Sequence, residues 1–353
     1  MKKKVLICTF SMGVGGMETF LKNIVNTIDK NKFEIKFAIN QEPIDKTYIN
    51  ILKENNIKFE YIGNVRPNPY KYLKRMNNFM MKEGPFDVIH TNLEYQGALV
   101  LMLAKKNNIK KRIAHSHTTN VTTFYNKLFM PLYRFLFRKY ATTFFACGEE
   151  AGEYMFGRNI NFKVIKNGID VNKFLNFSVA EKKKLCIGQI GRLSKEKNQL
   201  FSIKIIEELH KRGKKFHLYL IGDGPERSNI EKEINEKELN SYVHLLGMQN
   251  DIAKFYHQFN IFLLPSLYEG VPYALLEAQG SSAFTFASQN VSKESDLGLG
   301  LLEFVPLDVN QWVEKILTFE ERTISNDEIL KTFEEKGFNL NSVIKILEVE
   351  YEI

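Results

Sequence analysis

Short apolar segments that alternate with amphipathic ones are the feature that most constrains the fold of this chain. Phe33 to Ile39 has the length and the β-branched and aromatic content of a buried strand, whereas Met17 to Ile28 repeats apolar residues at helical spacing. Strands that alternate with helices predict a parallel sheet covered by helices on both faces. In the first half the predicted strands are residues 4–9, 33–39, 86–90, 111–115 and 143–147, and the predicted helices are 17–28 and 98–106.

The second half begins the same alternation again. Its predicted strands are residues 184–190, 216–221, 243–246 and 261–264, and its predicted helices are 198–212, 230–235 and 252–258. A chain of 353 residues is also too long for one ordinary core. The predicted fold class is therefore α/β, with two Rossmann-like domains at residues 1–168 and 169–337 and a linker within 167–183.

Residues 338–353 form a third predicted segment. Val343, Ile346, Leu347 and Tyr351 place apolar side chains in register along a helix at 339–351. The neighbouring sequence offers this helix no partner. We therefore expect it to pack back on the first domain.

Composition places the chain among globular proteins that are kept inside the cell. The three cysteines are far apart and lie in apolar stretches, which is typical of reduced, buried thiols. The longest apolar run, Ala98 to Ala104, is far shorter than a membrane-spanning helix. Residues 1–170 hold 27 Lys and Arg against 14 Asp and Glu, so the positive charge lies in the first half. A basic half suits nucleic acid, an anionic bilayer or an acidic substrate.

Glu269 and Glu277 stand eight positions apart around a predicted strand, turn and helix start. Gly270 and Pro272 mark the turn, and Pro272 suits the first helical position. A helix N-terminus attracts phosphate through its unpaired N–H groups and partial positive charge. A carboxylate further along that helix can accept hydrogen bonds from a ribose. The pair predicts a nucleotide site, with two solvated surface glutamates as the alternative.

A glycine-rich turn, Ser11 to Glu18, follows the first predicted strand. Glycines let the backbone approach a phosphate closely, and Glu18 lies in the first helical turn, where it favours the helix dipole. The dinucleotide fingerprint requires glycine or alanine in place of Glu18 and an acidic residue in place of Asn40, so NAD binding is disfavoured. A tight turn without a ligand is the alternative.

Arg192 and Lys197 lie in the matching turn of the second half, after a predicted strand and before a predicted helix. Both can converge on an anion. Charges in such loops are often solvated. Together with the glycine turn and the glutamate pair, however, they predict three loops around one nucleotide diphosphate.

His90, His115 and His117 follow two predicted strands of the first half. A histidine at the carboxyl end of a strand can bond a sugar hydroxyl or move a proton, and a structural role is the alternative. A metal site would need further ligands, and the chain has no Asp-x-Asp for a nucleotide-bound metal. We therefore expect neither a metal nor a cofactor.

Residues 124–140 mix aromatic side chains with Lys127, Arg134, Arg138 and Lys139, and residues 65–82 add a second aromatic and basic stretch. Such segments can lie in a membrane interface. A buried helix whose basic side chains reach solvent explains the composition equally well.

Taken in order, these loops resemble the retaining glycosyltransferases of family four, which have the GT-B fold of two Rossmann-like domains facing across a cleft. The likeness covers nearly the whole chain, and the order and spacing of six motifs agree. The motifs are Gly15-Gly-Met-Glu18, His117, Asn167-Gly-Ile-Asp170, Gly191-Arg192 with Lys197-Asn198, Gly222-Asp-Gly-Pro225 and Glu269 to Glu277. Residues 112–119 and 288–294 look most like the branch that builds capsules and exopolysaccharides.

The resemblance implies a role for each matched position. Residues 1–168 would bind the acceptor and residues 169–337 the nucleotide-sugar donor. The implied catalytic residues are Glu269 and His117, which would contact the transferring sugar, and Arg192 and Lys197, which would hold the diphosphate. The implied donor-binding residues are Gly15, Gly16, Arg192, Lys197, Met248 beside the base, Glu269, Gly270, Tyr273, Ala274, Leu275 and, for the ribose, Glu277.

The implied function is the retaining transfer of a hexose or N-acetylhexosamine from a nucleotide sugar, with UDP preferred, to a saccharide acceptor. The acceptor is expected on a lipid diphosphate, in surface polysaccharide synthesis, and the enzyme in the cytoplasm with peripheral contact to the membrane. No nucleic-acid partner is expected, because the basic residues are dispersed and no nucleic-acid motif appears. The alternatives are a sugar-nucleotide epimerase of the same fold and a nucleotide-sugar binding protein without activity.

Overall fold

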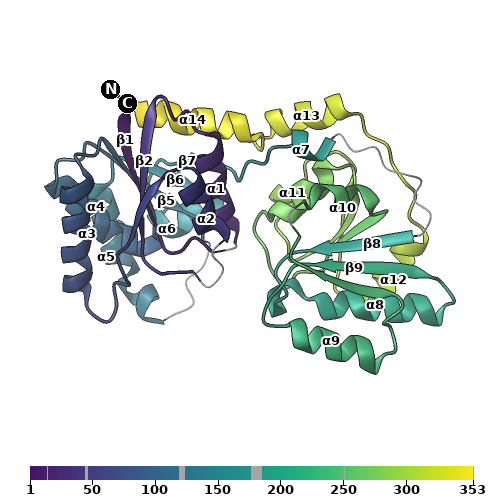
Figure 1. Cartoon of the computed structure of the whole chain (residues 1–353). Coiled ribbons are helices and arrows are strands. Elements are labelled where there is room, and N and C mark those ends of the chain that lie inside the picture. Colours follow the sequence, from purple (N-terminus) through teal and green to yellow (C-terminus); the bar gives the residue numbers. More distant parts are fainter. Residues whose placement is uncertain (14, 44–46, 119–123, 176–184, 250, 353) are drawn as a thin grey trace. The chain divides into compact units, whose positions relative to one another are not determined.

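The computed structural model describes residues 1–13, 15–43, 47–118, 124–175, 185–249 and 251–352. Its contacts divide the chain into two units, one of Met1–Gly168 with Leu340–Ile353 and the other of Ile169–Asn339 (Figure 1). The division falls between residues 168 and 169, where the sequence predicted it. The second unit extends to 339 rather than 337, because the Ile169 N–H donates to the Phe338 carbonyl (2.9 Å).

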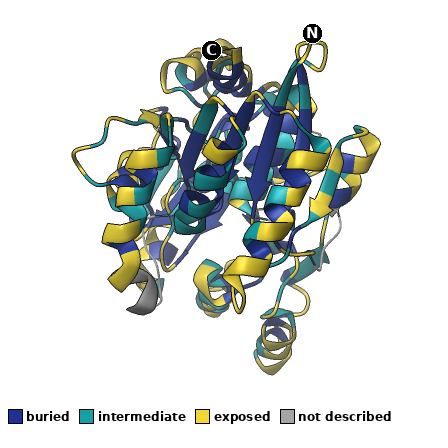
Figure 2. Cartoon of the chain, turned by 90° about the vertical axis from the view of Figure 1, so that its left-hand side faces the viewer, coloured by how far each residue is buried: buried dark blue, intermediate teal, exposed yellow. Residues whose placement is uncertain are grey.

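The sheet of unit 1 has seven parallel strands in the order β3-β2-β1-β4-β5-β6-β7. Side chains alternate along a strand, so Val5 and Ile7 of β1 enter one core and Leu6 and Cys8 the other. Figure 2 shows the buried strands between helices whose outward sides are exposed. The strands are β1 Lys3–Thr9, β2 Phe33–Ile39, β3 Lys58–Tyr61, β4 Val88–Asn92, β5 Lys111–Ser116, β6 Thr143–Ala146 and β7 Lys163–Val164. The helices are α1 Gly16–Thr27, α2 Thr47–Glu54, α3 Pro69–Glu83, η1 Glu94–Gln96, α4 Gly97–Lys106, α5 Phe124–Tyr140, α6 Glu149–Phe156 and α14 Leu340–Glu352.

The sheet of unit 2 has six parallel strands in the order β10-β9-β8-β11-β12-β13. Its two faces are covered by separate buried clusters, one around Trp312 and the other around Tyr256. The strands are β8 Leu185–Ile190, β9 Phe216–Ile221, β10 Val243–Gly247, β11 Ile261–Leu264, β12 Phe284–Ser288 and β13 Leu302–Val305. The helices are α7 Asn172–Leu175, η2 Lys195–Lys197, α8 Gln199–Lys211, α9 Arg227–Glu236, α10 Ala253–Gln258, α11 Tyr273–Gly280, η3 Lys293–Ser295, α12 Val309–Leu317 and α13 Asn326–Glu335.

Each sheet has one point at which the strand order reverses. In unit 1 the chain builds outward from β1 to β3 and then returns to place β4 on the other side of β1. In unit 2 it builds from β8 to β10 and returns to place β11 beside β8. The connections on the two sides of such a point leave in opposite directions, which opens a crevice at the carboxyl ends of the strands where ligands bind. The candidate site residues are therefore expected at these two switch points.

Most predicted elements occur, with ends that differ by no more than three residues. The edge strands β3, β7 and β13 were not predicted, because most of their side chains are only partly buried and the apolar pattern is weak. The predicted linker needs correction. Val171 and Phe174 are buried in the core of unit 2, and residues 176–184 lie outside the described part of the chain.

Helix α14 belongs to unit 1 although it follows unit 2 in the sequence. Its buried stripe repeats every three or four residues and consists of Leu340, Val343, Ile344, Leu347 and Tyr351. Ile346 was predicted on this stripe but is 43% exposed, because it lies one position short of the repeat. The carboxylate of Glu350, which is also buried, pairs with Lys111 of β5 (2.7 Å) and with Lys163 of β7.

Candidate active site

Two loops meet at the switch point of unit 2. The loop after β8 spans residues 191–198 and the loop after β11 spans residues 265–272. The Asn198 side chain donates to the Pro265 carbonyl (3.0 Å), and the Leu267 N–H donates to the Glu196 carbonyl (2.8 Å). The Lys197 ammonium pairs with the Glu269 carboxylate. The structure thus joins two predicted site residues that are distant in the sequence.

Lys197 and Glu269 form a mostly buried charged pair. Their side chains are 21% and 16% exposed, so water screens the pair less than it would at the surface. The Ser266 hydroxyl donates to Glu269 Oε1 (3.1 Å) and orients the carboxylate. An ammonium has three N–H donors, so Lys197 can bond Glu269 and an anionic ligand together. Arg192, in the same loop, is exposed to solvent.

Buried side chains hold the Arg192–Lys197 loop from beneath. Gln189 donates to the Lys197 carbonyl (2.8 Å), and Gln199 donates to the Arg192 carbonyl (2.9 Å). The Ser202 hydroxyl in turn donates to Gln189 (2.7 Å). Buried hydrogen-bond networks of this kind rigidify the segments that they join.

The glycines of the motif at 222–225 allow the loop after β9 to pack closely against the loop after β8. A Cβ on Gly222 would lie 2.0 Å from the Gly191 carbonyl oxygen, and a Cβ on Gly224 would lie 2.3 Å from that of Leu193. Neither distance is possible for a side chain. The motif therefore presses the loop after β9 against the loop that carries Arg192.

Helix α11 begins at Tyr273. Pro272 is its capping residue, with ψ 135°, and not the first helical residue that the sequence predicted. The first-turn N–H groups of a helix have no acceptor within it, and Pro272 offers no side-chain cap. The Leu275 N–H, however, already donates to the Pro272 carbonyl (3.1 Å), which disfavours Leu275 as a phosphate contact. Tyr273 and Ala274 stay predicted contacts.

Glu277 is held by a tyrosine of the neighbouring helix. The Tyr256 hydroxyl of α10 shares its one proton between Glu277 Oε2 (3.0 Å) and the Ala274 carbonyl oxygen (3.1 Å). Tyr256 is fully buried, which raises its pKa well above the usual value and keeps it a donor. The bond orients the Glu277 carboxylate, as a ribose-binding residue requires.

Two further predicted donor contacts lie open to a ligand. Met248, which follows β10, is 55% exposed. At Gly270 no heavy atom of the other described residues, its two chain neighbours apart, lies within 4 Å of the position a Cβ would take. Their contacts with the base and the sugar stay predictions.

The glycine turn of unit 1 lies at the other switch point, after β1. At Gly16 the space around a Cβ position is open, whereas at Gly15 such a position lies 2.5 Å from Glu18 Oε2. Burial raises the pKa of Glu18, and a backbone hydrogen bond partly offsets it. Because an ionised carboxylate repels phosphate, a phosphate at Gly15 requires Glu18 to move or take up a proton. The sequence analysis did not foresee this constraint.

The three histidines of unit 1 form one cluster of neighbouring rings. His115 and His117 lie at the carboxyl end of β5, whereas His90 lies in the middle of β4 and does not follow that strand as predicted. His90 Nε2 lies 3.0 Å from His115 Nδ1, and the ring centroids of His115 and His117 are 4.1 Å apart. His117 Nε2 lies 2.8 Å from Asn92 Oδ1, which can only accept, so Nε2 carries the proton and Nδ1 is left as an acceptor. The backbone N–H of His117 donates to Glu94 Oε1 (3.0 Å).

Burial sets the charges in this cluster. It lowers the pKa of His90 and His117 to about 3 and that of His115 well below its usual value. It raises the pKa of Glu94 to about 7, although the hydrogen bond from the His117 backbone N–H partly offsets this. At neutral pH the rings are therefore uncharged, and His117 is suited to bond hydroxyl groups rather than to transfer protons.

These histidines should make the fold sensitive to acid. Their folded pKa values lie below the unfolded value, so stability is complete above about pH 6.5 and is lost as the pH falls toward 3, by about 1.4 kcal/mol per pH unit for each ring. Glu94 has a raised pKa, so between about pH 4.5 and 7 its contribution to stability rises as the pH falls and cancels the loss from one histidine ring. Urea unfolding at pH 7, 6 and 5 should show this slope.

In a His90→Gln variant the free energy of unfolding should fall less steeply with decreasing pH, by the contribution of one ring. The control His210→Gln changes an exposed position of α8 and should keep the full pH dependence. Equal slopes in both variants would contradict the assignment.

Asn92, Glu94, Ser266 and Tyr256 are site residues that the sequence analysis missed. Asn92 and Glu94 lie two and four positions beyond the predicted strand 86–90, so the rule that ligands lie near the carboxyl ends of strands would have found them. Ser266 and Tyr256 had no such signal, because their contacts with the two glutamates exist only in the folded unit.

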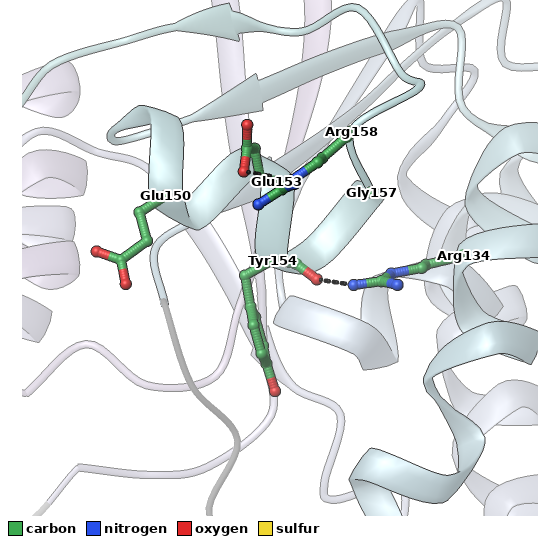
Figure 3. Close-up of a pocket in the computed structure, with 6 residues that line it drawn as sticks. All are labelled: Arg134, Glu150, Glu153, Tyr154, Gly157 and Arg158. Atoms are coloured by element: carbon green, nitrogen blue, oxygen red, sulfur yellow. Dashed lines mark hydrogen bonds and ion pairs between the residues drawn. The ribbon is translucent and has the colours of Figure 1, made fainter.

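A separate pocket in unit 1 lies between α5 and α6. It is lined by Arg134, Glu150, Glu153, Tyr154, Gly157 and Arg158 (Figure 3). Arg134 donates to the Tyr154 carbonyl across it (2.6 Å). It contains none of the predicted site residues.

The fold also occurs in other solved structures. The structure of Alr3699/HepE from Anabaena in complex with UDP superimposes with a TM-score of 0.79 over 100% of both chains, at 17% identity. At that identity the likeness shows the fold alone. The two parallel-sheet units are therefore those of a GT-B protein, as predicted.

Comparison at the level of sequence defines the family. Residues 14–173 match the family model Glycosyltransferase Family 4, and residues 170–334 match Glycosyl transferases group 1. EpsF of Bacillus subtilis (strain 168), named as a glycosyltransferase, is 31% identical over 335 residues, which are 89% of this chain and 87% of EpsF. The chain belongs to glycosyltransferase family 4, as the resemblance predicted.

A second relative carries a fuller name. The UDP-Gal:alpha-D-GlcNAc-diphosphoundecaprenol alpha-1,3-galactosyltransferase of Escherichia coli is 26% identical over 224 residues, which are 57% of each chain.

Proposed function

We propose that this glycosyltransferase moves a hexose or N-acetylhexosamine from a UDP-sugar to a saccharide carried on a lipid diphosphate, with retention, in surface polysaccharide synthesis. The observation that carries the proposal is the Lys197–Glu269 pair at the switch point of unit 2. The UDP in the HepE complex and the substrates in the name of the Escherichia coli relative support the donor and the acceptor. Family membership favours transfer over epimerisation or binding alone.

Charge development explains how unit 2 would act. Cleavage of the sugar–phosphate bond leaves a diphosphate whose negative charge grows in the transition state. Lys197, Arg192 and the positive end of α11 stabilise that charge. Glu269, oriented by Ser266, bonds the sugar hydroxyls, and Glu277 bonds the ribose. We propose attack from the face of the leaving group, which retains the anomeric configuration.

Positive side chains also supply the charge that a metal would otherwise bring. Among the described residues, no group of three or more His, Cys, Asp or Glu is placed to hold a metal ion. We propose metal-independent transfer because Lys197 and Arg192 can stabilise the diphosphate, and full activity in excess EDTA is the expected result.

Donor binding and product analysis test the function. Calorimetry with UDP-, GDP- and ADP-sugars should give the tightest binding with a UDP-sugar. Proton NMR of the product should show the anomeric configuration of the donor. Absence of binding to every nucleotide sugar, or an inverted product, would contradict the proposal.

Helix α5 provides a surface for the lipid-linked acceptor. Leu128, Leu132 and Phe135 are 62%, 50% and 57% exposed, and Lys139 lies over the Phe135 ring (5.9 Å). The sequence of α5 contains no acidic residue. An exposed apolar face with basic flanks fits the headgroup region of an anionic bilayer. We propose that α5 rests on the cytoplasmic membrane face; no helix of the described residues is long and apolar enough to span it.

A double variant, Leu132→Glu with Phe135→Glu, should lower binding to anionic vesicles by at least about tenfold, because it removes apolar contact and adds repulsion. Co-sedimentation with phosphatidylglycerol vesicles would measure this. The matched control is Ile346→Glu with Val349→Glu, which changes two exposed apolar residues of α14 in the same unit. If the two double variants bind the vesicles equally well, or if wild-type binding does not depend on the lipid charge, α5 is not the docking surface.

A further inference from the structure

Buried polar atoms without partners surround His117 in unit 1. Within the described residues, Asn92 Nδ2, Glu94 Oε2 and His115 Nε2 are buried and have no hydrogen-bond partner. Asn92 and His115 are only 1% and 3% exposed. The Ser116 hydroxyl, near Glu94, is engaged by the Ala151 carbonyl (3.1 Å). Because buried polar atoms are nearly always paired, three such atoms in one cluster indicate a place for a ligand or for bound water.

All three residues contact His117 through their other atoms. Asn92 Oδ1 accepts from the His117 ring, Glu94 Oε1 accepts from the His117 backbone N–H, and the His115 ring lies tilted against the His117 ring. His117 is itself partly exposed, so the cluster borders the surface. It lies at the carboxyl ends of strands β4 and β5, beside the switch point between β1 and β4, where a doubly wound sheet binds ligands.

The proton on His115 follows from the hydrogen bonds behind it. Tyr351 is fully buried, and within the described residues His90 Nδ1 is the partner of its hydroxyl (2.7 Å), so the hydroxyl donates to that nitrogen. His90 Nε2 then carries the proton and donates to His115 Nδ1. This leaves His115 Nε2 as an N–H donor.

The unpaired atoms are thus two donors, on Asn92 and His115, and one acceptor on Glu94 when its carboxyl is ionised, above its pKa of about 7. A hydroxyl group donates one hydrogen bond and accepts two, which is the complementary set. Glu94 also has φ +48°, a left-handed conformation that is unusual for a residue other than glycine and that is retained mainly at functional sites.

We propose that Asn92, Glu94 and His115 bind hydroxyl groups of the acceptor saccharide, with Glu94 accepting the hydrogen bond that a hydroxyl donates. This assignment rests on the proposed function and extends it to the acceptor side. The assignment makes Glu94 a specificity residue of unit 1, because its carboxylate selects a saccharide whose hydroxyl can donate a hydrogen bond to Glu94 Oε2.

Glu94→Gln is the sharpest test, because it keeps the shape and the acceptor Oε1 while turning the unpaired oxygen into a donor. The probes are the methyl glycosides of glucose, galactose and N-acetylglucosamine, added to the full chain saturated with UDP. In the wild type the NMR signals of the His115 and His117 rings should shift with at least one glycoside. In Glu94→Gln the affinity for it should fall roughly thirtyfold, while UDP affinity by calorimetry stays within about twofold.

Asn92→Asp, which replaces the unpaired donor by an acceptor, should cause a similar loss if Glu94→Gln does not fold. Glu149→Gln, on an exposed position of α6, is the matched control and should behave as wild type. Three results would overturn the assignment. The first is an unchanged glycoside affinity in Glu94→Gln, and the second is a joint loss of UDP affinity and melting temperature in that variant. The third is the absence of a histidine shift with every glycoside, which is the result expected if the unpaired atoms bind only water. Because the shifts need no sugar transfer, they remain readable even if the proposed function fails.

Discussion

Replacing Lys197 by alanine is expected to lower sugar transfer by at least about a hundredfold while the protein stays folded. Lys197 is the cation that the structure fixes at the switch point of unit 2, through Glu269 on its ammonium and Gln189 on its carbonyl. A pre-positioned cation stabilises the departing diphosphate without reorganisation in the transition state. Its loss should appear mainly in kcat.

The measurement is initial-rate kinetics with a UDP-sugar and an acceptor, together with the melting temperature. Lys195→Ala is the matched control, since Lys195 lies in the same short helix η2 but is exposed. It should retain nearly the wild-type rate. A Lys197→Ala enzyme that works at the wild-type rate would remove this residue, and with it the present account of the donor site, from the mechanism.

Truncation of Leu347 is expected to destabilise unit 1 by about 3 kcal/mol, the ordinary loss for a buried leucine changed to alanine. Leu347 is fully buried in the core that α14 shares with α1. Ile346→Ala, one residue away but 43% exposed, should change stability by no more than about 0.5 kcal/mol. Urea unfolding of the two variants would measure the difference.

Deletion of the whole helix after Asn339 should have a larger effect. It removes every buried residue of α14, and with Tyr351 and Glu350 it removes the partners of His90 and Lys111. Over the five core residues of α14, losses of about 2–5 kcal/mol each add up to about 10–25 kcal/mol, which matches or exceeds the roughly 5–15 kcal/mol that stabilises a domain. Unit 1 should therefore unfold while unit 2 keeps its structure, which circular dichroism and limited proteolysis would show. A truncated chain in which unit 1 resists protease would contradict this role of α14.

Particular residues show how far the sequence analysis reached. The apolar runs of β2, β9 and β11 predicted those strands with the correct bounds, because a buried parallel strand must be apolar on both faces. The rule that ligands lie beyond the carboxyl ends of strands led to Lys197, Glu269 and His117. Asn92 and Glu94, two and four positions beyond the predicted strand 86–90, also fall under this rule.

Other site features carry no local signal. Ser266 and Tyr256 contact Glu269 and Glu277 only because the folded unit brings their segments together. The placement of Glu18 over Gly15 depends on side-chain packing, and that of Ile346 on the rotation of α14. Neither can be derived from residue spacing alone.

The sequence by itself determined the two Rossmann-like units, their division near residue 168 and the family, because strand and helix periods and motif order are written along the chain. Only the tertiary structure decided which charges pair, which carboxylates are oriented and which histidines are buried. These properties depend on distances and burial between segments that are remote in sequence, and electrostatic and hydrogen-bond energies change steeply with both.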